Sequence, residues 1–207
     1  MATRGRPRSF DRQTALRRAM EVFWARGYEA AALTDLQHAM GGITAPSLYA
    51  AFGSKEALFR EAVELYTTTL GAPMIQALEE QLTARASIER LLRAAVAAFR
   101  KPGMPRGCML LLGAMTTAPA GRGVQVYLRG LRARRRKLIC ERLRRAAAAG
   151  ELPATLDFSA VASFYTTVID GLAIQARDGA SQKDLQFAAG SAMAAWDTMI
   201  ASARASQ

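Results

Sequence analysis

The chain has 207 residues, of which 51% are apolar, and 28 Lys and Arg against 17 Asp and Glu give a formal net charge of +11. This composition provides a substantial core, and the positive charge favours a polyanionic partner such as nucleic acid or an anionic membrane surface. No apolar run approaches the ~20 residues of a membrane-spanning helix. The N-terminus lacks the apolar core of a signal peptide. The two cysteines have no metal-ligand spacing, which indicates reduced thiols in a cytoplasmic protein. Because Ala is abundant and β-branched residues are sparse, we expect an all-α chain.

Residues 1–9 form a basic arm that contains Gly and Pro, with arginines at Arg4, Arg6 and Arg8. The proline excludes a helix through this segment, and the segment has nothing to bury. Arginines around a Gly-Arg-Pro sequence suit the narrow minor groove of A·T-rich DNA. A disordered solubilising tail is the alternative interpretation.

Apolar residues recur at helical spacing through residues 10–82, and capping residues, Gly and Pro mark the helix ends. The expected elements begin with a helix that Asp11 caps and Gly27 ends, a second helix that Thr34 caps, and a turn at Gly41–Gly42. A third helix, opened by Ala45 and Pro46, should end by residues 52–53, and a long helix that Ser54 caps should break or kink at residues 71–73. Three helices with a Gly-bearing turn before the third predict a helix-turn-helix unit in residues 10–70, whose third helix would enter the major groove.

Six residues of this unit suit contacts with DNA: Thr34, Thr44, Ala45, Ser47, Tyr49 and Lys55. Thr34, at a helix N-terminus, can offer a hydroxyl and backbone N–H groups to a phosphate, and Tyr49 and Lys55 can also reach phosphates. The other three begin the third helix, where hydroxyls can bond to base edges and the alanine methyl can meet a thymine methyl. A plain helical bundle with Tyr and Lys on a solvated face is the alternative.

Residues 23–28, 33–36 and 46–59 closely resemble the DNA-binding domain of the TetR/AcrR family of transcriptional regulators. The resemblance implies a homodimer of about nine helices per chain, in which a long helix joins the helix-turn-helix unit to a ligand-binding and dimerisation domain in residues 71–207. It places the same six residues at positions that contact DNA. Many members carry a bulky residue where this chain has Ala50 and Ala51, so sequence choice is expected to depend more on the arm and on DNA shape.

The C-terminal part is predicted to contain helices over residues 88–99, 124–149, 157–177 and 182–203, with a very apolar stretch at residues 106–117. The last two helices are rich in small residues, which allow helices to approach closely. The family resemblance makes these two helices the dimer interface.

No paired carboxylates, phosphate-binding Gly loop or metal-ligand cluster stands out, and the single His38 has no partner near it in sequence. We therefore expect no enzyme activity and no cofactor. Adaptable apolar, aromatic and thiol side chains between the middle helices suggest a small-molecule pocket. Its candidate residues are Phe99, Met104, Cys108, Leu112, Met115, Tyr127, Leu131, Arg135, Tyr165 and Ile169. Ordinary core packing is the alternative for each of them.

Two candidates carry particular chemistry. Arg135 falls within the apolar stripe of its helix, and a buried arginine needs an anion. That anion is either a structural carboxylate, with Asp170 as the preferred candidate, or the carboxylate of an acidic ligand. Cys108 begins a helical stretch where N–H groups could lower the pKa of its thiol, so that redox or electrophile sensing stands beside simple packing.

Together these features predict a cytoplasmic, homodimeric repressor that binds a palindromic double-stranded operator and is released by an unknown small molecule. An activator or a ligand-independent DNA-binding regulator is the alternative within the same class. A helical adaptor for acidic protein surfaces is the alternative from another class. No membrane partner is expected.

Overall fold

A computed structural model describes residues 10–80, 83–113 and 121–205, and these residues form ten α-helices and no strand. The helices are α1 (Arg12–Ala30), α2 (Leu33–Ala39), α3 (Ala45–Phe52), α4 (Lys55–Thr69), α5 (Ala72–Glu79), α6 (Ala84–Phe99), α7 (Met109–Leu112), α8 (Arg122–Ala148), α9 (Phe158–Arg177) and α10 (Gln182–Ala205). The all-α prediction is therefore confirmed. None of these helices combines the length and apolar content that a membrane crossing needs.

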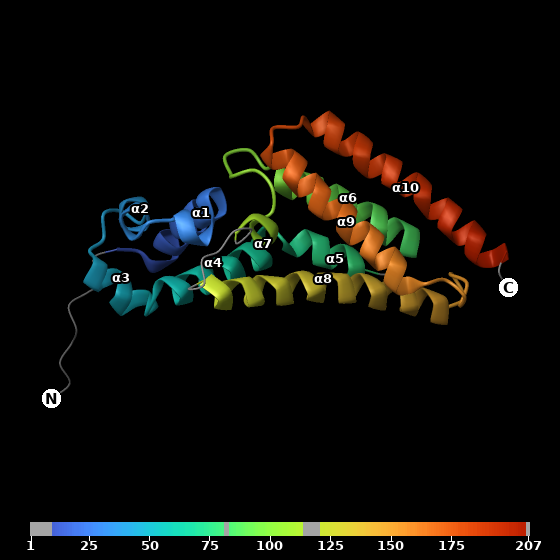
Figure 1. Ribbon diagram of the computed structural model, residues 1–207, viewed down its shortest axis with the longest axis horizontal. Helices are drawn as coiled ribbons and strands as arrows, with labels where there is room; N and C mark the ends of the chain where they lie inside the picture. The colour runs from blue at the N-terminus through green and yellow to red at the C-terminus, as the bar shows by residue number, and fades with distance from the viewer. Residues whose placement is uncertain (1–9, 81–82, 114–120, 206–207) are drawn as a thin grey trace.

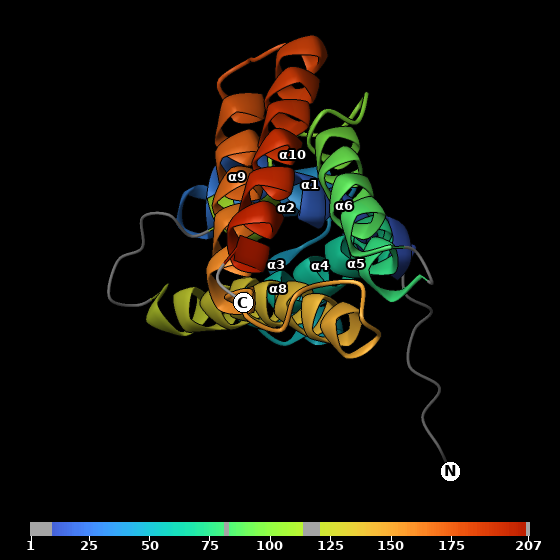
Figure 2. The ribbon, with the colours of Figure 1, turned by 90° about the vertical axis from the view of Figure 1, so that its right-hand side faces the viewer.

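The helix-turn-helix unit lies at one end of an elongated molecule, and its last helix, α4, leads into a body built from α5 to α10 (Figure 1). Along this body, α8 lies on one side, and α9 and α10 lie on the other (Figure 2). Phe23, Trp24, Leu48 and Phe59 are fully buried in the helix-turn-helix unit and hold α1, α3 and α4 together. The rings of Phe23 and Phe59 meet edge to face with centroids 5.1 Å apart.

Side-chain caps set most helix starts of this unit as expected. The Asp11 carboxylate accepts from the backbone N–H groups of Gln13 and Thr14 at 3.1 and 3.3 Å. Ser54 Oγ accepts from Ala57 N at 3.0 Å and starts α4. Gly27, at φ 80°, interrupts α1, and helical residues resume as far as Ala30.

The predicted cap of α2 is wrong. The helix starts at Leu33, so Thr34 is its second residue and Ala32 precedes the helix. Asp35 provides the polar group at this helix start, because its carboxylate accepts from the Ala32 backbone N–H at 3.2 Å. The Thr34 hydroxyl is therefore exposed and not used as a cap.

The expected break in the long helix is present and raises the number of helices to ten. Helix α4 ends at Thr69, and α5 begins at Ala72. Pro73 has no backbone N–H with which to continue α4, whereas it is tolerated in the first turn of α5.

Two hydrogen bonds tie the helix-turn-helix unit to the body. Tyr28 N donates to the carbonyl of Gly113, just after α7, at 2.8 Å. The Arg177 guanidinium, at the end of α9, donates to the carbonyl of Ala25. Helix α7 also contacts α4, α8 and α9. This single turn of helix therefore lies between the body and the unit that precedes it.

Candidate functional site

Helix α3 turns one face outward. Thr44 caps it by accepting from Ser47 N at 3.3 Å, and the Thr44 hydroxyl donates to Ser47 Oγ at 3.0 Å. Leu48 and Phe52 are buried behind the helix, whereas the ring of Tyr49 is 45% exposed. A short helix thus presents two adjacent hydroxyls at its N-terminus and a phenol one turn later, which suits contact with phosphates and base edges.

The remaining two predicted contact residues flank α3. Thr34 is exposed near the start of α2. Lys55 lies over the ring of Tyr28 at 4.7 Å and donates to the carbonyl of Glu29 at 3.4 Å. Partial burial lowers the pKa of Lys55, and the charge of Glu29 opposes this shift. Intramolecular contacts therefore hold the ammonium group near the outward face of the unit.

The helix-turn-helix unit itself is not basic. Residues 10–70 contain six Lys and Arg and seven Asp and Glu. The three arginines of the arm, Arg4, Arg6 and Arg8, lie outside the described residues. They supply the positive charge at this end of the sequence. Because DNA phosphates are neutralised by Lys and Arg, a duplex on α3 would need that charge or another basic surface.

A cavity of about 230 Å³ lies between α4, α5, the start of α7 and α8. Its lining is mainly apolar, and its walls are formed by Tyr66, Thr67, Thr68, Gly71, Met74, Ile75, Cys108, Leu110, Leu131, Arg134, Arg135 and Leu138. The structure thus brings together three of the ten predicted pocket residues: Cys108, Leu131 and Arg135. The cavity touches both α4 and the segment that begins α7, and both elements lead to the helix-turn-helix unit.

Arg135 is the main polar group of this cavity. Its side chain is only 6% exposed, and one of its terminal nitrogens donates to the carboxylate of Asp170 on α9. The predicted structural partner is thereby confirmed. The Nε of Arg135 is buried and has no hydrogen-bond acceptor among the described residues. A buried N–H without an acceptor is costly, so a ligand that supplied one would gain binding energy here.

Tyr66 and Cys108 adjoin Arg135 in the cavity wall. Both side chains are buried and line the cavity. Burial is the largest cause that raises the pKa of Tyr66 well above its ordinary value, whereas the nearby Arg135 charge lowers it. The phenol is therefore neutral at physiological pH, and Cys108 is enclosed as a buried thiol.

The sequence matches two family models: bacterial regulatory proteins of the tetR family over residues 15–62, and the tetracyclin repressor-like C-terminal domain over residues 84–191. It is 33% identical to the HTH-type transcriptional repressor ComR of Escherichia coli over 96% of this chain and 94% of ComR. The chain belongs to the TetR family of transcriptional regulators. This family consists of DNA-binding regulators, so the expected absence of enzyme activity agrees with the assignment.

Two further relatives of this TetR family member cover most of the chain. The HTH-type transcriptional repressor BdcR of Escherichia coli is 29% identical over 95% of this chain and 94% of its own length. A cysteine-substituted form of the TetR family regulator CifR, solved with a 26-base-pair operator DNA, is 46% identical. That structure matches with a TM-score of 0.89 over 92% of this chain and all of the CifR chain.

The other predicted pocket residues lie outside the 230 Å³ cavity. Phe99, Tyr165 and Ile169 are fully buried in the packing of α6 and α9, and the Tyr165 hydroxyl donates to the carbonyl of Ala192 at 3.3 Å. These side chains fill the core of the TetR-type body. Aromatic and apolar residues serve equally well in a core and in a pocket, and their sequence positions do not distinguish the two.

Four more candidates are dispersed. Tyr127 lies under the guanidinium of Arg60 at 4.5 Å, between α8 and α4. Met104 belongs to the loop after α6 and faces a hollow beside α1 and α2. Leu112 ends α7, and Met115 lies outside the described residues. None of the three described residues lines the cavity around Arg135.

Sequence reasoning missed the cavity wall from α4 and α5, which includes Thr67, Gly71 and Met74. The available signal was the break at Gly71 and Pro73. A break between two helices interrupts a continuous packed surface, and here it borders the cavity.

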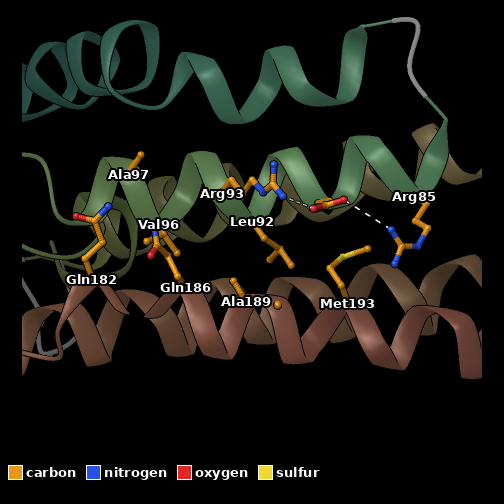
Figure 3. Close-up of a pocket in the computed structure, with 11 residues that line it drawn as sticks. Arg85, Leu92, Arg93, Val96, Ala97, Gln182, Gln186, Ala189 and Met193 are labelled. Carbon is orange, nitrogen blue, oxygen red and sulfur yellow. Dashed lines mark hydrogen bonds and ion pairs between the residues drawn. The ribbon is translucent and has the colours of Figure 1, made fainter. Parts of the chain in front are cut away.

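A larger hollow of about 600 Å³ lies between α6 and α10 (Figure 3). Its charged residues already pair with one another, because Glu89 accepts from Arg93 at 2.5 Å and lies 3.6 Å from Arg85. No residue of α1, α4 or α7 lines it. A molecule in this hollow would have no direct contact with the elements that lead to the helix-turn-helix unit, whereas the smaller cavity borders two of them.

Proposed function

We propose that this TetR family protein is a homodimeric repressor that binds a palindromic operator and is released by a small molecule in the cavity around Arg135. The observation that carries the proposal is the arrangement of the site. An exposed α3 face and the cavity around Arg135 are joined through α4 and α7. Such a regulator would act in the cytoplasm, at chromosomal DNA.

Relatives support the DNA-binding part of this proposal. CifR, at 46% identity, was solved on operator DNA, and ComR and BdcR are named as repressors. Thr44, Ala45, Ser47 and Tyr49 of the present chain are gathered on or beside the outward face of α3. We infer that they contact bases and phosphates in the major groove, with Thr34 and Lys55 at the flanking phosphates and the arm in the minor groove.

The outer surface of α9 and α10 supports dimerisation. Ile174 and Phe187 are 37% and 77% exposed on these helices. Gly171 on α9 faces open space, since a Cβ at this position would meet nothing within 4 Å. Helical glycines are destabilising unless something approaches them closely. We infer that the same two helices of a second copy pack on this surface, as the last two helices were expected to do.

The cavity fits a small and largely apolar effector with one hydrogen-bond acceptor or carboxylate for the Nε of Arg135. For the effector to release DNA, it must bind more tightly to a conformation whose two α3 helices no longer match the operator spacing. Cys108 and Leu110 line the cavity and flank the start of α7. A shift of α7 would strain the hydrogen bond from Tyr28 to Gly113 and thereby move the helix-turn-helix unit.

Replacing Tyr49 by Ala is expected to weaken operator binding by about tenfold, because an exposed phenol on α3 would no longer reach a phosphate. The fold should persist, since the ring is not part of the core. Fluorescence anisotropy with an operator duplex obtained by in vitro selection measures the loss. Gln76→Ala, an exposed change on α5, is the matched control. Equal affinities of the two variants would rule out the assigned role of Tyr49.

Replacing Arg135 by Met is expected to abolish release by acidic effectors while the protein still binds DNA. The partner Asp170 has a side chain that is 28% exposed, so water can solvate its carboxylate after the change. The assay compares release of operator DNA by small apolar carboxylic acids and by their amides, with an expected loss of at least about tenfold for the acids. If the acids release operator DNA from the Arg135→Met variant as they do from the original protein, Arg135 is not the effector contact.

A further inference from the structure

The positive charge of the protein is concentrated on one helix. Helix α8 contains ten Lys and Arg residues and one acid, Glu141. Its net charge of +9 therefore accounts for most of the +11 of the whole chain. Residues 10–70, which form the helix-turn-helix unit, have one more acid than they have Lys and Arg. Outside the N-terminal arm, a polyanion would thus meet its strongest attraction at α8.

Only some of these cations have protein partners. Arg135 and Arg142 are buried and pair with Asp170 and Glu151, and Lys137 lies 3.6 Å from Glu141. Two more bond to backbone carbonyls, at Leu110 and Leu78, and another lines the cavity around Arg135. The remaining four are exposed and have no carboxylate partner among the described residues: Arg122, Arg129, Arg136 and Arg144.

These four arginines form one stripe, here termed the α8 basic face. They are spaced by seven, seven and eight residues, and at ~100° per residue such spacings return to nearly the same side of a helix. Because Arg144 follows Arg122 by 22 residues, the stripe extends for about 33 Å at ~1.5 Å per residue. Unpaired like charges in a row repel one another, and an external polyanion would relieve that repulsion.

The α8 basic face is free in the subunit. Helix α8 borders the body on the side away from α10, so a dimer formed through α9 and α10 would leave it uncovered (Figures 1 and 2). The N-terminal end of α8 lies beside α4, where Arg60 covers Tyr127, and the helix then runs away from the helix-turn-helix unit. In the proposed dimer, two such faces would therefore flank the body, and each would extend away from the DNA-binding end.

We propose that the α8 basic face binds the phosphate backbone of duplex DNA without regard to sequence. Guanidinium groups bind phosphate oxygens in a bidentate manner, and the face consists of arginines. Val126 is the large apolar side chain exposed beside them, so the face lacks the apolar and aromatic residues with which a helix inserts into lipid. This inference goes beyond the proposed function. The phosphates belong either to the DNA that flanks a bound operator or to a second duplex.

The test compares the full-length protein with the variant Arg129→Gln/Arg136→Gln/Arg144→Gln. A matched control, Arg90→Gln/Arg93→Gln/Lys101→Gln, removes three exposed charges from α6 and the loop after it. Each protein is titrated, over a series of salt concentrations, with a selected operator duplex trimmed to its edges and with the same duplex extended by about 30 base pairs on each side. A third titration adds a labelled unrelated duplex to protein already saturated with the trimmed operator.

The α8 variant is expected to bind the extended duplex about tenfold more weakly, and its plot of log affinity against log salt should flatten by about 0.9 for each phosphate that it no longer neutralises. Its affinity for the trimmed duplex should match that of the control, which keeps the proposed operator binding separate from this test. If only the third titration changes, the phosphates come from a second duplex. Equal behaviour of the two variants in all titrations would overturn the proposal, as would α8-dependent binding to phosphatidylglycerol vesicles without any effect on DNA.

Discussion

Replacing Asp170 by Ala is expected to lower the free energy of unfolding by about 3 kcal/mol, because it leaves the Arg135 guanidinium buried without an anion. The Arg135 side chain is 6% exposed, and Asp170 is its carboxylate partner. The Nε of the same side chain already lacks an acceptor, so the remaining protein offers little compensation. Urea unfolding at a fixed protein concentration measures the change.

Two companion variants isolate the buried charge as the cause. Glu80→Ala removes the partner of Arg90, but both side chains of that pair are more than one third exposed, so the loss should stay below about 1 kcal/mol. Adding Arg135→Met to Asp170→Ala removes the unpaired charge, and much of the lost stability should return. If Asp170→Ala is no more damaging than Glu80→Ala, the ion pair does not have the energetic role that its burial indicates.

Replacing Gly171 by Glu is expected to convert the dimer into monomers and to weaken operator binding by at least about 100-fold. Gly171 is exposed on α9 and has open space beside it within the subunit, so the monomer can accommodate the longer side chain. In a symmetric dimer, the two carboxylates would enter an interface of small and apolar residues without counter-ions. A monomer would then bind only one half-site.

Gly130→Glu on α8 is the matched control for this change. Gly130 is also helical and exposed, and a Cβ there would meet nothing within 4 Å. The control is judged by molecular mass in sedimentation equilibrium, since its added charge lies beside the α8 basic face. A Gly171→Glu protein that remains dimeric would exclude α9 as the centre of the interface.

Local signals in the sequence predicted much of the fold. Asp11 and Ser54 cap their helices as expected, and Ala45 and Pro46 open α3, because each of these effects depends on only a few neighbouring residues. The start of α2 was misplaced because Ala32 stands at the position before the helix without a capping side chain, and Asp35 accepts from its backbone N–H instead. The Gly71 break was visible, although its consequence for the cavity depends on how α5 packs against α8.

The pocket was predicted less well than the fold. Arg135 and its partner could be predicted because a charge inside an apolar stripe has few possible partners, and the contact with Asp170 is present. Phe99 and Tyr165 were expected in the pocket but lie in the core. Helical periodicity identifies the inward face of each helix, whereas the pairing of those faces depends on contacts between distant residues. The cavity arises where α4, α5 and α8 fail to fill the space between them.

Two copies of α3 are expected to read a symmetric operator. Selection of bound duplexes from a random pool with the full-length protein tests it most directly, followed by sedimentation of the recovered complex. We expect a two-fold symmetric sequence with half-sites about one helical turn apart or slightly more, bound through whole dimers, and its loss in the Thr44→Ala/Ser47→Ala variant. Recovery of sequences without symmetry, or equal recovery with that variant, would show that paired α3 helices do not read the operator.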